Sequence, residues 1–195
     1  MLNVKVLLDR SGSMDRDWNE TLGSLNGYVE SLRTEGVEAE ITVVAFDTVN
    51  AYDTLRHKVA LADFQPITHA DAMPRGGTPL WDAAGRMIAE AEGENEERTI
   101  IVIITDGMES YGSSTDYTQA TVKEAVARVE ARNWQVVFLG ANFDTVEHAT
   151  SVGLSAARSF NMIDAATRTM GYDRLVASST AYATTGRSID LSVDE

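Results

Sequence analysis

Apolar residues along the chain gather into short runs that are separated by stretches with helical spacing. Five runs are rich in β-branched and apolar residues, which is typical of buried strands, and they cover residues 3–9, 38–47, 99–106, 134–141 and 157–162. Residues 51–59 alternate in polarity and follow the second run after only a short connection. That connection predicts a hairpin, so we expect residues 51–59 to form an antiparallel strand at an edge of the sheet.

Helical periodicity fills most of the segments between these runs. The first helix is predicted from apolar residues that recur on one face, namely Trp18, Leu22, Leu25, Val29 and Leu32. A second helix is expected to have Thr78 as its N-cap and Pro79 at its first helical position. Two capping-box pairs predict further helix starts, and a last helix is expected near the end of the chain: Asp116 with Gln119, Asp144 with Glu147, and residues 163–184.

Strands that alternate with helices predict an α/β fold with a largely parallel sheet and helices on both faces. We expect a single domain over residues 1–185 and a tail over residues 186–195. In such sheets, ligands bind beyond the carboxyl ends of the strands, where the strand order reverses. The two most apolar strands end at Asp9 and Asp106. If these strands are neighbours at the reversal, the two carboxylates lie side by side.

Composition narrows the classes of partner and of metal. The formal net charge is −14, which repels nucleic acid and anionic lipid, so we expect neither nucleic-acid binding nor membrane insertion. The chain has no cysteine, which excludes disulfides and thiolate metal sites. The first residues lack the pattern of a secretory signal, so we expect none, and the longest apolar run, 99–105, is far shorter than the roughly 20 residues that span a bilayer. We therefore expect a cytoplasmic or virion-associated protein.

Three short motifs offer oxygen ligands: "DRSGS" at 9–13, "GGT" at 76–78 and "TDG" at 105–107. Carboxylate and hydroxyl oxygens suit Mg²⁺, Mn²⁺ or Ca²⁺ and argue against zinc or copper. The set is small and rich in neutral hydroxyls, which favours Mg²⁺ or Mn²⁺ over Ca²⁺. An ion held mainly by hydroxyls keeps uncancelled charge and can attract an outside carboxylate.

In this order and at the ends of predicted elements, the three motifs resemble the von Willebrand factor type A (vWA) domain and its metal-ion-dependent adhesion site (MIDAS). The resemblance covers about residues 1–162 and matches small standalone members from bacteria and phages. It implies a Rossmann-like, doubly wound sheet with one antiparallel edge strand and a divalent cation bound by Asp9, Ser11, Ser13, Thr78 and Asp106. It also implies recognition of a partner protein through an exposed Asp or Glu, and we expect that partner to contact a rim of Arg10, Gly77, Gly107 and Met108.

Other interpretations compete with a metal-dependent binding module. The Thr78 hydroxyl can cap a helix instead of binding metal, and the fold can serve as an assembly component of a virion or a multisubunit complex. A magnesium-dependent phosphatase would also place an aspartate at the end of the first strand. However, Ser11 stands where its second aspartate belongs, and no lysine lies between Lys58 and Lys123. We therefore predict that the chain is not an enzyme and has no catalytic residues.

Overall fold

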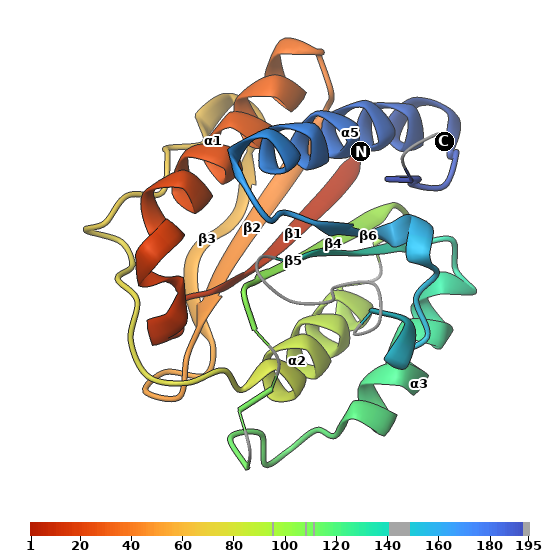
Figure 1. The fold of residues 1–195 in the computed structure, drawn as a ribbon. Coiled ribbons are helices and arrows are strands. Elements are labelled where there is room, and N and C mark those ends of the chain that lie inside the picture. The colour runs from red at the N-terminus through yellow and green to blue at the C-terminus, as the bar shows by residue number, and fades with distance from the viewer. Residues whose placement is uncertain (95, 108, 111, 141–148, 193–195) are drawn as a thin grey trace.

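The computed structural model describes residues 1–94, 96–107, 109–110, 112–140 and 149–192. Within these residues, six strands form one sheet in the order β3-β2-β1-β4-β5-β6 (Figure 1). The strands are β1 (Leu2–Asp9), β2 (Ala39–Phe46), β3 (Asp53–Ala60), β4 (Thr99–Thr105), β5 (Gln135–Gly140) and β6 (Ser159–Asn161). All neighbouring strands are parallel except β3, which pairs antiparallel with β2 at the edge. The predicted α/β fold class with its antiparallel edge strand is confirmed.

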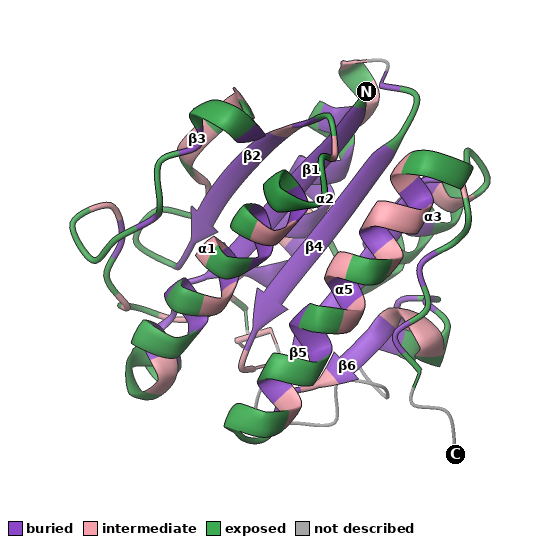
Figure 2. Cartoon of the chain, turned by 90° about the horizontal axis from the view of Figure 1, so that it is seen from above, coloured by how far each residue is buried: buried purple, intermediate pink, exposed green. Residues whose placement is uncertain are grey.

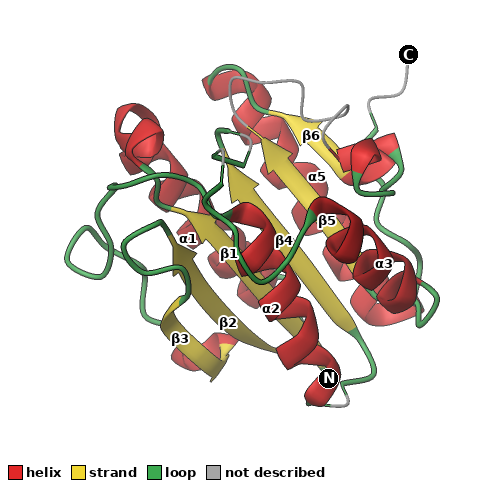
Figure 3. Cartoon of the chain, turned by 90° about the horizontal axis from the view of Figure 1, so that it is seen from below, coloured by secondary structure: helices red, strands yellow, loops and turns green. Residues whose placement is uncertain are grey.

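Helices cover both faces of the sheet. Figure 2 shows α1 (Trp18–Thr34) and α5 (Ala165–Thr185) over one face, and Figure 3 shows α2 (Leu80–Gly93) and α3 (Gln119–Glu130) over the other. In the described connections, three short 3-10 helices lie at Gly12–Asp17, Leu61–Asp63 and Ala156–Arg158. None of the described helices is both long and apolar enough to cross a membrane.

The alternation of side chains along each strand divides the core into two layers. Val6 and Leu8 of β1 pack with the residues of α1 and α5, whereas Leu7 packs with those of α2 and α3. The central strands β1 and β4 are therefore buried on both faces, which explains the continuous apolar run of β4 from Ile100 to Ile104 and the apolar residues that surround Asn3 and Lys5 in β1.

The start of α2 differs from the prediction. The helix begins at Leu80 with Pro79 at its N-cap position and without a capping side chain, so Thr78 is not the cap. The N–H groups of the first turn instead find acceptors in a distant loop. Trp81 donates to the Glu109 carboxylate at 3.0 Å, and Asp82 donates to the Ser114 hydroxyl at 3.1 Å. Because tertiary partners satisfy these N–H groups, no local cap is needed.

The start of α3 also differs from the prediction. Its capping box consists of Thr118 and Thr121, not of Asp116 and Gln119. The backbone N–H of Asp116 donates to the Asp82 carboxylate at 2.9 Å, so this residue belongs to the loop that packs on α2. The remaining predicted pair, Asp144 with Glu147, lies outside the described residues.

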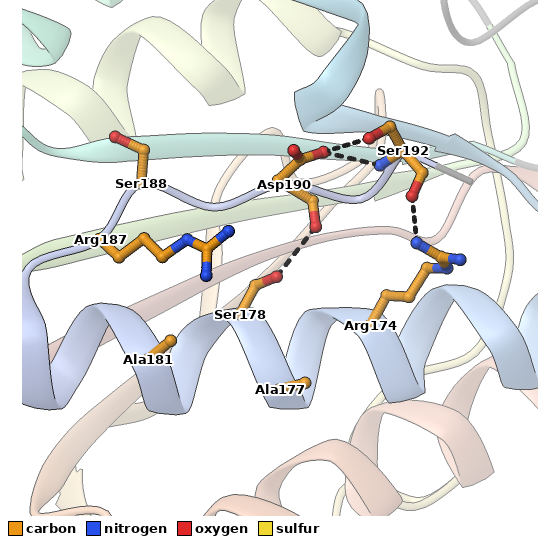
Figure 4. A pocket seen from close by; sticks show the side chains of 8 residues that line it. All are labelled: Arg174, Ala177, Ser178, Ala181, Arg187, Ser188, Asp190 and Ser192. Atoms are coloured by element: carbon orange, nitrogen blue, oxygen red, sulfur yellow. Dashed lines mark hydrogen bonds between the residues drawn. The ribbon is translucent and has the colours of Figure 1, made fainter. Parts of the chain in front are cut away.

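The segment that follows α5 folds back along that helix. Ile189 and Leu191 are buried there, although residues 186–195 are expected to form a tail. The segment and α5 enclose a pocket of about 270 Å³ (Figure 4). Inside it, Arg174 donates to the carbonyl of Ser192, and the Ser178 hydroxyl donates to the carbonyl of Asp190 at 2.9 Å. These bonds fasten the segment to the helix, and the pocket contains none of the predicted site residues.

Candidate metal site

The two strands that carry the predicted aspartates are neighbours at the centre of the sheet. Leu8 of β1 pairs with Ile104 of β4, and the strand order reverses between these two strands. Asp9 is the last residue of β1, and Asp106 directly follows β4. The structure thus places both residues at the switch point, where doubly wound sheets bind ligands.

Asp9 is fully buried and accepts a hydrogen bond on each carboxylate oxygen. Its Oδ1 accepts from the Ser11 backbone N–H at 2.7 Å, and its Oδ2 accepts from the Thr105 hydroxyl at 2.6 Å. Burial raises the pKa of Asp9 to about 6, although the hydrogen bonds from Thr105 and Ser11 work in the opposite direction. Asp9 is therefore held in one orientation, directly behind the serines of its loop.

A chain of side-chain hydrogen bonds joins the first and third motifs. The hydroxyl oxygens of Ser11 and Ser13 are 3.1 Å apart, and the Ser13 hydroxyl donates to Oδ1 of Asp106 at 2.8 Å. Ser11 is buried, Asp106 is half-buried and Ser13 is exposed, so the chain leads from the interior to the surface. Burial raises the pKa of Asp106, while the hydrogen bond from Ser13 lowers it.

The second motif lies against the first through a contact between glycines. The N–H of Gly12 donates to the carbonyl of Gly76 at 3.0 Å, and a Cβ at Gly12 would lie 3.4 Å from that carbonyl oxygen. Thr78 is buried, and the loop beyond β4 holds its backbone, because its N–H donates to the Ser110 hydroxyl at 2.9 Å. Within the described part of the chain, the Thr78 hydroxyl forms no hydrogen bond. Freed from capping α2, it remains available to a ligand.

The four predicted rim residues do not share one environment. Gly77 and Gly107 are half-buried at the loop surface, and Met108 lies outside the described residues. Arg10 is buried, and its Nε donates to the Asp47 carboxylate at 2.5 Å. Because Asp47 draws the guanidinium beneath the loop, Arg10 does not present it at the rim, and that expectation needs correction.

Sequence analysis missed two residues that shape this site. Thr105 bonds Asp9, and its place in the "TDG" motif was a usable signal. Asp47 follows β2, the strand next to β1, so it stands at the carboxyl edge for the same topological reason as Asp9. No motif marks Asp47, because its partners Arg10 and Arg75 lie far from it in the sequence.

The donor set fits a hard divalent cation. Hydrogen bonds bring the Ser11 and Ser13 hydroxyls together with the Asp9 and Asp106 carboxylates, and the loop of Thr78 lies against them through Gly76. No cluster of three His, Cys, Asp or Glu side chains suited to a metal occurs among the described residues. Asp9 and Asp106 also form no ion pair with a Lys, Arg or His within that part of the chain. Hydroxyl-rich oxygen sites without imidazole or thiolate are typical of Mg²⁺ and Mn²⁺ rather than of zinc or copper.

Comparison with known proteins identifies the family. The model of the von Willebrand factor type A domain matches residues 3–171. The chain belongs to this family. No curated protein matches the chain. The matched residues of this vWA domain include all three oxygen-bearing motifs, at 9–13, 76–78 and 105–107.

Solved structures with the same fold come from varied proteins. Proximal thread matrix protein 1 from the mussel byssus, in a structure with a zinc occupied MIDAS motif, is 12% identical with a TM-score of 0.67, and the alignment covers 92% of this chain and 46% of that one. A von Willebrand factor type A protein from Catenulispora acidiphila is 20% identical with a TM-score of 0.63 and respective coverages of 92% and 42%. The pilus adhesin SpaC from Lactobacillus rhamnosus GG is 9% identical with a TM-score of 0.65 and coverages of 92% and 30%. This vWA domain thus spans less than half the length of these proteins, and the likeness is one of fold.

Proposed function

We propose that this vWA domain is a metal-dependent protein-binding module whose partner presents an exposed Asp or Glu. The observation that carries the proposal is the hydrogen-bonded chain from Ser11 through Ser13 to Asp106, which joins two motifs at the switch point. Ser11, Ser13 and Thr78 would hold Mg²⁺ or Mn²⁺ through their hydroxyls. Asp9 and Asp106 would hold it directly or through water. When bound there, such an ion would supply the positive charge that attracts the partner's carboxylate.

The contacts of Asp9 support an orienting role for this residue. Both of its carboxylate oxygens already accept hydrogen bonds, one of them from the backbone of Ser11. A buried carboxylate of this kind fixes the loop that carries the ligands and adds negative charge behind them. This distribution of roles leaves neutral hydroxyls nearest to the ion, so its charge is incompletely cancelled.

The overall charge of the chain supports a local attraction rather than a long-range one. At −14, the surface repels an acidic partner, but charges beyond about 8 Å are screened at physiological salt. A bound divalent cation reverses the sign at short range. The partner should therefore offer one carboxylate in surroundings that are neutral or basic. The related structures of a byssus matrix protein and a pilus adhesin support a binding or assembly role without identifying the partner.

Affinity capture with and without a chelator tests this proposal. The immobilised protein is incubated with extract in Mg²⁺ or in EDTA, and Asp9→Ala is compared with Asp15→Ala, which changes an exposed aspartate near the same loop. We expect a partner that elutes with EDTA and binds Asp15→Ala but not Asp9→Ala. Chelator-resistant capture by all variants would instead indicate a metal-independent assembly role. Changing the partner's interface carboxylates to amides should identify one whose loss weakens binding at least about tenfold, or about 1.4 kcal/mol.

A further inference from the structure

The Asp47 carboxylate accepts hydrogen bonds from three separate loops next to the candidate metal site. Its Oδ2 accepts from Arg10 Nε at 2.5 Å and from Arg75 Nε at 3.1 Å. Its Oδ1 accepts from the backbone N–H groups of Val49 at 2.5 Å and Asn50 at 2.8 Å, which closes the connection between β2 and β3. One buried carboxylate therefore bonds three loops at the carboxyl edge of the sheet.

Backbone hydrogen bonds also join the loops that Asp47 contacts. The N–H of Arg75 donates to the carbonyl of Arg10 at 2.8 Å, and the N–H of Arg10 donates to the carbonyl of Phe46 at 3.1 Å. The loops of the first and second motifs therefore pack on each other next to the residue that holds both arginines. The packing is close at Gly76, where φ is +65° and a Cβ would lie 2.6 Å from the Thr48 hydroxyl oxygen.

We propose that Asp47 is a positioning residue for the metal site, which sets the loop of Ser11 and Ser13 against the loop of Thr78 by gripping Arg10 and Arg75. Among the described residues, the hydrogen bonds of its carboxylate come from Arg10, Arg75 and the backbone of Val49 and Asn50, not from the proposed hydroxyl ligands. The predicted effect of Asp47 on metal binding rests on the proposed function. Its predicted effect on the contacts between the loops does not depend on a metal.

Electrostatics explain why one carboxylate can hold both arginines. Burial disfavours the charged form of Asp47, but the N–H groups of Asn50 and Val49 and the two guanidiniums outweigh that effect and keep its pKa below the usual range. Hydrogen bonds in which the donor and the acceptor are ionised are shorter and stronger than neutral ones. Loss of the charge should therefore release two loops together rather than one.

Asp47→Asn is the informative variant, because the amide oxygen keeps one acceptor while the negative charge is lost. Asp53→Asn is the matched control. Asp53 also pairs with Arg10, at 2.7 Å, but it is half-exposed and in the described part of the chain does not contact Arg75. Each variant is titrated with Mg²⁺ by calorimetry. In the metal-free proteins, amide hydrogen exchange is measured at Gly12 and Arg75, whose N–H groups form the bonds between the loops.

The expected result is a loss of Mg²⁺ affinity of at least about tenfold in Asp47→Asn and of less than about threefold in Asp53→Asn. Exchange at Gly12 and Arg75 should be at least about tenfold faster in metal-free Asp47→Asn than in wild type. Unchanged Mg²⁺ affinity, or exchange no faster than in Asp53→Asn, would overturn the proposal. A wild type that binds neither Mg²⁺ nor Mn²⁺ would reject the proposed function instead, and the exchange comparison would then decide the role of Asp47.

Arg75→Ala keeps the proposal testable if Asp47→Asn does not fold. The Arg75 side chain is 47% exposed, so its removal leaves no cavity in the core. We expect faster exchange at Gly12 and an affinity for Mg²⁺ that is at least about threefold weaker, because one of the two gripped loops is released. Wild-type exchange and affinity in this variant would overturn the role of Asp47.

Discussion

Two clusters of charged side chains lie along the central part of the sheet, one near the end of α2 and one at the carboxyl edge. They differ in whether their charges are neutralised by other side chains. Where α2 ends, Lys5 and Lys58 each contact the carboxylates of Glu94 and Glu96, at 2.6–3.5 Å. Burial works against ionisation of Glu94, but the hydrogen bonds and charges of Lys5, Glu96 and Lys58 together outweigh it and lower the pKa of Glu94. Burial raises the pKa of Glu96, while the charge of Lys5 and the hydrogen bond from Lys58 work in the opposite direction. Positive and negative charges are equal in number, so the cluster is complete within the chain.

The cluster at the carboxyl edge is not balanced in this way. Asp9 and Asp106 have hydroxyl and backbone partners, and within the described residues neither pairs with a cationic side chain. Burial raises the pKa of both carboxylates. The comparison teaches that a charge cluster closed by its own counter-ions stabilises the fold, whereas one left negative and hydroxyl-rich is suited to bind a cation from outside.

The largest expected effect is that of Asp9→Asn on metal binding. The variant removes the buried charge but keeps the shape of the side chain, so Mg²⁺ affinity should fall by about 100-fold while the fold persists. Calorimetry measures the affinity, circular dichroism checks the fold, and Asp15→Asn is the control. If the variant binds Mg²⁺ as tightly as wild type, the carboxyl-edge cluster is not the metal site.

Breaking the balanced cluster should affect stability instead of metal binding. Lys5→Met leaves two carboxylates to a single lysine, and the free energy of unfolding should fall by about 2–4 kcal/mol. Mg²⁺ affinity should stay within about twofold of wild type. Urea denaturation measures the stability, and Lys123→Met, at an exposed lysine, should change it by less than about 0.5 kcal/mol. An equal loss of Mg²⁺ affinity would show that the clusters are coupled.

The raised pKa of Asp9 predicts a pH dependence in the metal-free protein. Between the ordinary value of 3.8 and about 6, the unfolded chain has lost the Asp9 proton while the folded chain retains it, so stability falls as the pH rises. Asp9→Asn lacks this contribution. It should match wild type below pH 4 and exceed it by about 2–3 kcal/mol above pH 6. Denaturation curves in EDTA across this range measure the difference, and parallel pH profiles would contradict the assignment.

The smallest expected effect is that of Ser13→Ala. Ser13 is exposed, so its truncation leaves no cavity, and metal-free stability should change by less than about 0.5 kcal/mol. Mg²⁺ affinity should fall about tenfold, because one hydroxyl oxygen and its bond to Asp106 are lost. Ser188→Ala, at another exposed serine, is the control in the same titration. Equal affinities for the two variants would exclude Ser13 from the site.

Most of the fold could be predicted from the sequence, because hydrophobic periodicity depends only on residues that are close together in the chain. All six strands appear within two residues of their predicted bounds, and the helix predicted over 163–184 is α5 at Ala165–Thr185. Helix starts were harder to predict. Thr78 and Pro79 satisfy the usual pattern of a capped start, yet α2 begins at Leu80 because Glu109 and Ser114 accept the hydrogen bonds of its first turn. A pattern within a few residues cannot reveal an acceptor about 30 positions away.

The sequence by itself determined the order of strands and helices, the apolar central pair, and the oxygen-rich residues at the ends of β1 and β4, because each depends on neighbours within a few positions. Only the tertiary structure decided that Arg10 turns inward, that the Thr78 hydroxyl is left free of capping, and that Asp47 bonds three loops. The physical reason is that a buried polar group must find a partner wherever the packed chain offers one. That choice depends on which loops meet at the carboxyl edge, and the chain brings them together only when the sheet has formed.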